Sequence, residues 1–125
     1  MLQCSQLKYK PYREKIEFMS SPFIVMITTT PNKEDANKIA QTLLAENLAG
    51  CVPMIGPISS HYYWDDELCQ DEEYICLIKR SQQHYQTLEN TIKKIHPYEV
   101  PEIISLPIQQ GSEGYLSWLN QQLKP

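Results

Sequence analysis

The chain has 125 residues and a net charge of −4, which is enough for one domain with its own hydrophobic core. Its longest fully apolar run, 23–27, is too short to cross a bilayer, so we expect no membrane span. The first 22 residues carry four basic and two acidic side chains, which leaves a charge of −6 on the rest and argues against a nucleic-acid-binding protein with a basic face.

The basic leader ends in a Ser-Ser-Pro sequence that is typical of a linker. We predict that residues 1–22 form a flexible N-terminal extension and that residues 23–125 form the folded domain. Met19 lies just before this boundary and is a candidate for the physiological start. The leader lacks a secretory pattern, and the four cysteines are scattered without a C-x-x-C pair, so we expect reduced thiols and a cytoplasmic location.

A strand followed by a helix opens the predicted domain. Residues 23–30 are apolar and β-branched without a break, which is typical of a strand covered on both faces. Pro31 ends this strand, and Asn32 can cap a helix with Asp35 in its first turn. Asn47 tolerates the left-handed conformation that ends many helices. Apolar residues recur along this helix at intervals of three and four, as one stripe: Ala36, Ile39, Ala40, Leu43, Leu44 and Leu48.

A long hairpin follows. The extended stretch 49–60 is interrupted by two prolines and a glycine, so this strand must be bent, bulged or at a sheet edge there. It continues through the aromatic segment 61–64, reverses at Asp65-Asp66 and returns along 67–80. The pattern predicts two paired strands with an aromatic tip before an acidic turn.

The second half of the domain repeats the helix and strand signals. Ser81 can cap a second helix, which Pro97 ends, and residues 101–108 predict a fourth strand. A short last helix follows Ser112. The predicted order is β-α-β-β-α-β-α. We therefore expect an α+β, ferredoxin-like split βαβ fold, with helices on one face of an antiparallel sheet and one appended helix.

Three segments resemble one known family. They are Tyr-Trp-Asp-Asp-Glu-Leu at 63–68, His-Pro-Tyr-Glu-Val-Pro-Glu at 96–102 and Tyr-Leu-Ser-Trp-Leu at 115–119. With Cys51 after Leu-Ala-Gly, they make the chain from about Phe23 to Leu123 similar to the CutA divalent-ion-tolerance family.

This resemblance implies a homotrimer whose long hairpins extend the sheets of neighbouring subunits. It also implies a role in tolerance of divalent cations, copper above all, with no accepted catalysed reaction. The sequence adds its own reason for assembly, because a long hairpin exposes unpaired strand edges. No phosphate-binding loop, metalloprotease helix or nucleophile elbow is present, so we do not expect an enzyme.

Two alternatives remain for the function. One is a signalling trimer like the PII proteins, which would bind a small anionic effector between subunits. The other is an enzyme that acts on a small anionic substrate in the same cleft.

The implied cofactor is Cu²⁺ or another divalent cation. At positions where copper ligands have been proposed in part of the family, this chain has Thr28 and Ile95, which leaves His96 as the remaining candidate ligand. Cys51 is a second candidate. The structural alternatives are that His96 closes the second helix, whose end suits an imidazole, and that Cys51 is a small apolar strand residue. Cys4 lies in the leader, and Cys69 and Cys76 are seven apart, on opposite faces of a regular strand.

A further set of side chains combines aromatic rings, one cation and two carboxylates. Such a set suits a pocket for a small polar ligand, and it equally suits an interface held by aromatic anchors and Lys–Glu pairs. Its members are Tyr63, Trp64, Lys79, Tyr98, Glu99 and Glu102.

Overall fold

The computed structural model describes residues 21–125 as one antiparallel sheet with three helices. The leader up to residue 20, with Met19 and Cys4, lies outside the described residues. The strand order is β2-β3-β1-β4, which confirms the predicted ferredoxin-like α+β fold. The elements are β1 (Phe23–Thr30), α2 (Lys33–Ala45), β2 (Met54–Trp64), β3 (Glu67–Ser81), α3 (Tyr85–Ile95), β4 (Ile104–Pro107) and α4 (Glu113–Gln121).

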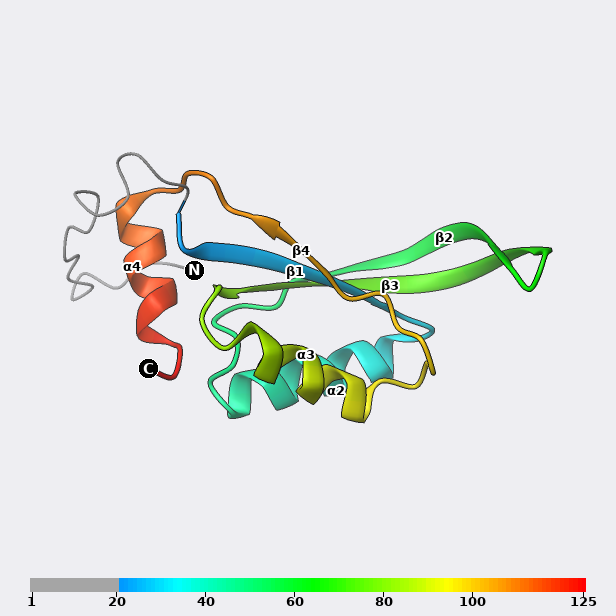
Figure 1. The fold of residues 1–125 in the computed structure, drawn as a ribbon, viewed down its shortest axis with the longest axis horizontal. Helices are drawn as coiled ribbons and strands as arrows, with labels where there is room; N and C mark the ends of the chain where they lie inside the picture. The colour runs from blue at the N-terminus through cyan, green and yellow to red at the C-terminus, as the bar shows by residue number, and fades with distance from the viewer. Residues whose placement is uncertain (1–20) are drawn as a thin grey trace.

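Helices α2 and α3 lie side by side under one face of the sheet, and α4 packs at the end where β1 begins (Figure 1). Because side chains alternate along a strand, every second residue of β1 and β3 points at these helices. Met26, Cys76 and Ile78 are fully buried there. They pack against the apolar stripes of the helices, which include Ala36, Ile39, Leu43, Leu88 and Ile92. Each large buried side chain stabilises the fold by about 1.5–3 kcal/mol.

On the opposite face of the sheet, α4 covers only the end near Phe23 and Lys79, and no described helix covers the rest (Figure 1). The prediction that β1 is covered on both faces is therefore right for one face and, on the other, only for the start of the strand. Val25 and Ile27 point to the open side and are half-buried. Their β4 partners Leu106 and Ile104 are 52% and 49% exposed, and Ile55 of β2 is 49% exposed on the same side. The result is an apolar sheet face that meets solvent, which we call the open face.

Most of the predicted helix boundaries are confirmed. The Asn32 side chain accepts a hydrogen bond from the Asp35 amide at 2.8 Å, and the Ser112 hydroxyl accepts one from the Tyr115 amide at 3.3 Å. Asn47 has the predicted left-handed backbone, with φ of 56°. The Asn32 and Ser112 side chains thus bond amides that the first turns of α2 and α4 leave unpaired.

The predicted cap at Ser81 is wrong. Ser81 is the last residue of β3, where it pairs with Phe23, and α3 begins four residues later after His84. The cause is Arg80, whose buried guanidinium donates to the carbonyls of Ser81, Leu48 and Gln83. These bonds hold the end of β3 in place. Burial lowers the pKa of Arg80.

The hairpin has the irregularities that its sequence predicts. Its register shifts between Ile55 and Ile58, next to the glycine and proline. Asp65 and Asp66 both have positive φ, 51° and 64°, as a tight two-residue hairpin turn requires. β2 and β3 extend well beyond the helices as a long arm (Figure 1). β4 is shorter than the predicted 101–108 and spans four residues.

Two details complete the fold. Ser21 and Pro22, which the sequence assigned to the leader, bond to the domain: the Ser21 hydroxyl accepts from the Phe23 amide and the Pro22 carbonyl accepts from Gln82. Within residues 21–125, no helix is long and apolar enough to cross a membrane.

Two buried threonines of β1 test how a lone hydroxyl affects stability. Thr28 and Thr30 are both fully buried, but the Thr30 hydroxyl donates to the Asn32 carbonyl at 2.7 Å whereas the Thr28 hydroxyl has no partner among residues 21–125. We expect Thr28→Val to raise the free energy of unfolding by about 1 kcal/mol, and Thr30→Val to lower it by about 1 kcal/mol. Thermal and urea unfolding at one protein concentration measure both. Equal effects of the two substitutions would contradict this assignment.

Candidate functional site

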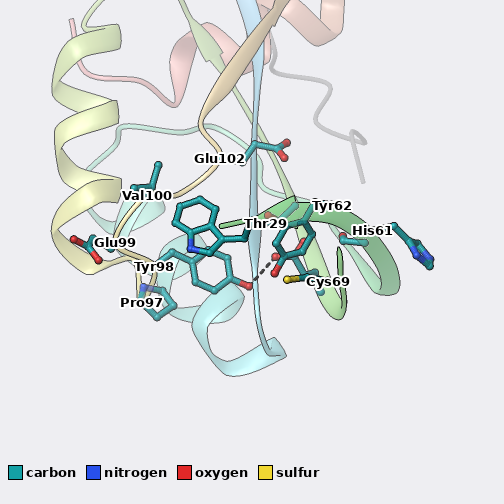
Figure 2. A pocket seen from close by; sticks show the side chains of 12 residues that line it. Thr29, His61, Tyr62, Cys69, Pro97, Tyr98, Glu99, Val100 and Glu102 are labelled. Carbon is teal, nitrogen blue, oxygen red and sulfur yellow. Dashed lines mark hydrogen bonds between the residues drawn. The ribbon is translucent and has the colours of Figure 1, made fainter. Parts of the chain in front are cut away.

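A cleft of about 670 Å³ lies between the hairpin arm and the loop that joins α3 to β4 (Figure 2). This volume is in the range of about 300–1,000 Å³ that is usual for small-molecule sites. The hairpin supplies Ser60, His61, Tyr62, Trp64, Cys69 and Glu73, the loop supplies Pro97, Tyr98, Glu99, Val100 and Glu102, and β1 supplies Thr29.

The hairpin wall of the cleft follows from strand register. Across the arm, Tyr62 pairs with Cys69 and Ile58 pairs with Glu73, and directly paired residues share one face. Trp64 is two residues beyond Tyr62, so it falls on that face as well. Tyr62 donates a hydrogen bond to Asp71, and this bond, together with the carboxylate charge, raises the pKa of Tyr62 to about 12. These contacts orient the Tyr62 ring along the wall.

The loop wall is held by His96, the residue that ends α3. Its Nε2 lies 2.8 Å from the Thr29 carbonyl, and its Nδ1 accepts the Tyr98 amide at 3.0 Å. This pattern fits a neutral imidazole with its proton on Nε2. Burial lowers the pKa of His96, although Asp35 and Glu73 act in the opposite direction. His96 thus ties the start of the loop to the end of β1.

Tyr98 crosses from the loop to the hairpin. Its hydroxyl donates to Glu73 Oε2 at 2.7 Å, the bond drawn dashed in Figure 2. Burial and this carboxylate raise the pKa of Tyr98. Tyr62 from the hairpin and Tyr98 from the loop point toward each other, whereas His61 points away into solvent (Figure 2). The Tyr98–Glu73 bond therefore closes one side of the cleft.

The cleft is acidic. Glu73, Glu99 and Glu102 line it, and no Lys or Arg does so among the described residues. Glu73 is 8% exposed, and its pairing with the Tyr98 hydroxyl satisfies one oxygen of the carboxylate. Charge and hydrogen bonding both favour a positively charged ligand in this cleft.

Only some of the candidate side chains predicted from the sequence line the cleft. Trp64, Tyr98, Glu99 and Glu102 line the cleft. Tyr63 is absent from that lining because it is adjacent to Trp64 and so falls on the opposite face, where it is 74% exposed. Lys79 lies far along β3, where its Nζ is 3.3 Å from the Tyr115 hydroxyl.

The two metal-ligand candidates also lie apart. Cys51 pairs with Lys79 in an isolated bridge, and neither Cys51 nor His96 lines the cleft. Both ring nitrogens of His96 already have partners, so a metal ion there would have to displace one of them. Within residues 21–125, no group of three or more His, Cys, Asp or Glu side chains could hold a metal ion.

Sequence reasoning missed Tyr62, Cys69 and Glu73 as residues of the site. The signal for them was available, because a two-residue turn at Asp65-Asp66 sets the pairing of the whole arm. Counting back from that turn places these side chains on the face that carries Trp64.

The fold and the cleft define a ferredoxin-like protein with a negatively charged site of small-molecule size. The chain matches the CutA1 divalent ion tolerance protein family over residues 24–122. It is 41% identical over 100 residues to the divalent-cation tolerance protein CutA of Yersinia pestis, with 80% of this chain and 84% of that protein covered. The protein of the same name from Thermus thermophilus is 39% identical over 97 residues, which are 78% of this chain and 94% of that one.

Among solved structures, CutA1 from Oryza sativa has a TM-score of 0.81 and 36% identity, and the match covers 84% of this chain and 96% of that chain. The chain belongs to the CutA1 divalent ion tolerance family, which confirms the resemblance read from its sequence.

The buried imidazole of His96 predicts a pH-dependent stability. Its folded-state pKa lies below the unperturbed 6.5, so below neutral pH the unfolded chain binds more protons than the folded one. The contribution of His96 is fully present above about pH 7 and is lost as the pH falls. Urea midpoints between about pH 7.5 and 5 should fall more steeply in the wild type than in His96→Gln. His61→Gln, which alters a solvated imidazole, should keep the wild-type slope, and a slope unchanged by His96→Gln would contradict the assignment.

Proposed function

We propose that this protein acts in divalent-cation tolerance as a homotrimer that binds a cation in the acidic cleft. The observation that carries the proposal is the charge of that cleft, which three carboxylates line without a Lys or Arg among the described residues. The names of its relatives support the same role for this chain. We also propose a cytoplasmic location, which the free thiols of Cys51, Cys69 and Cys76 support.

Carboxylate oxygens are hard donors, so they bind copper with less selectivity than imidazole or thiolate ligands do. The positions that could supply softer ligands beside His96 hold Thr28 and Ile95. No three His, Cys, Asp or Glu side chains converge on a metal site within residues 21–125. We therefore propose that Cu²⁺ or another divalent cation binds through fewer than three protein ligands, weakly and with little preference between metals. A PII-like anionic effector fits the cleft poorly, because Glu99 and Glu102 at its rim would repel it.

The open face supports assembly. Leu106, Ile104 and Ile55 are each about half exposed on a sheet surface that no described helix covers. Exposed apolar patches of this kind mark interaction sites, and a second copy of the chain offers a surface of matching chemistry. We propose that the open faces of three chains pack together and that the hairpin arms extend neighbouring sheets.

Calorimetric titration with Cu²⁺, Zn²⁺ and ATP tests the charge argument. We expect both metals to bind within about tenfold of each other, and ATP not to bind. The double variant Glu99→Gln with Glu102→Gln should weaken metal binding by about tenfold, because each substitution removes one charge from the cleft. Glu46→Gln, an exposed carboxylate outside the cleft, serves as the control. Tight binding of ATP with no binding of metal would favour the PII-like alternative.

Light scattering after size-exclusion chromatography tests the assembly. We expect about three times the 14.6 kDa mass of one chain, unchanged on dilution to micromolar concentration. Leu106→Lys should dissociate the assembly, since it places a charge in the packed face. Leu44→Lys alters a residue of similar exposure, 44%, on the outer side of α2 and should leave the mass unchanged. A monomeric wild type would rule out this arrangement.

A further inference from the structure

Two phenols and the carboxylates beside them present acceptors to the cleft. The hydroxyl protons of Tyr62 and Tyr98 are committed to the carboxylates of Asp71 and Glu73. Each phenol oxygen keeps acceptor capacity, and each carboxylate keeps lone pairs that these single bonds do not use. A ligand that uses these acceptors donates hydrogen bonds to them.

Aromatic faces line the same space. Trp64 is 54% exposed and Tyr62 is 40% exposed, and both lie on the face of the arm that forms the hairpin wall. Tyr98 stands opposite Tyr62 on the loop (Figure 2). The negative face of an aromatic ring attracts an ammonium or guanidinium group, and the attraction is larger where water is partly excluded. Aromatic carbon also accommodates the apolar body of an organic cation.

A bare metal ion uses only part of this chemistry. Hard cations need several oxygen ligands that converge on one point, and aromatic rings supply none. Within the described part of the chain, no three metal-binding side chains form such a group. The volume of about 670 Å³ is also far larger than one ion requires.

We propose that the cleft between the hairpin and the 97–102 loop binds a small organic ammonium cation, with its charge near Glu73 and Glu102 and its carbon chain against Trp64 and Tyr98. The inference rests on the proposed function in one respect, the negative charge of the cleft. It goes further in the occupant, because the aromatic walls also suit an organic cation, which would compete with a metal ion for the same carboxylates.

The matched probes are putrescine and adipate, which have the same four-methylene chain and opposite charge at both ends. Calorimetry on the full-length assembled protein should show saturable binding of putrescine and none of adipate. Putrescine affinity should fall as salt is raised, because charge contributes to binding. Separate titrations with Cu²⁺ and Zn²⁺ distinguish this inference from the proposed metal function. Binding of putrescine without metal binding supports the inference and removes metal binding in the cleft, whereas metal binding without putrescine binding overturns the inference alone.

Paired substitutions test the aromatic contribution. Trp64→Phe keeps a ring and should bind putrescine within a few-fold of the wild type, while Trp64→Leu should bind about tenfold more weakly. Tyr98→Phe and Tyr98→Leu give the same comparison on the loop wall, with light scattering to confirm that each variant is assembled. Glu46→Gln again serves as the charge control. Leucine variants that bind putrescine as well as their phenylalanine counterparts would overturn the proposal.

Discussion

The antiparallel pairing of β3 with both of its neighbours is the constraint on which the rest of the structure depends. β3 is the longest described strand, with 15 residues, and it pairs with β1 along its second half and with β2 along its first two thirds, from Glu67 to Cys76. Because its side chains alternate, one set that includes Cys76 and Ile78 enters the helix-covered core. The other set includes Glu73 and Cys69 and forms part of the cleft. A slip of one residue would exchange these two sets.

Local sequence signals predicted most of the elements correctly because their physical causes are local. An amide that needs a cap, as at Asn32, and a turn that needs positive φ, as at Asp65-Asp66, depend on residues a few positions apart. Ser81 has the same local signal as Asn32, and there the prediction failed. The Arg80 guanidinium prevents a helix from starting at Ser81. It does so by bonding one carbonyl in the chain after α2 and one in the chain before α3.

The candidate site was only partly predictable for a related reason. Tyr63 and Trp64 are neighbours in sequence with similar chemistry, yet the pleat of the strand places them on opposite faces. The contact between Tyr98 and Glu73 joins residues 25 positions apart. It depends on how the 97–102 loop crosses the end of β1, and no periodicity in the sequence encodes that path. The family resemblance located the loop, and only the three-dimensional fold determines which strand it faces.

The negative charge of the cleft is stronger evidence than the fold for choosing between the competing functions. Ferredoxin-like sheets carry many unrelated activities, so the architecture alone favours none of them. Three carboxylates line the cleft, and no Lys or Arg among residues 21–125 does, which disfavours phosphates and organic acids. The phenol oxygens of Tyr62 and Tyr98 add further acceptors. His96 matters here as a positioning residue, because it fixes the loop from which Tyr98 reaches Glu73.

The strand order also limits how copies of this chain can associate. Among the described residues, β2 and β4 are the two outer strands, so each chain has two different edges on opposite sides of its sheet. If the β2 edge of one copy pairs with the β4 edge of the next, every added copy still leaves one edge of each kind free. Growth stops only when the last copy meets the first, which makes ring closure the condition that separates a finite particle from a fibre. Sheet twist then becomes a determinant of solubility, because it sets the rotation from one copy to the next and hence the number of copies that close the ring.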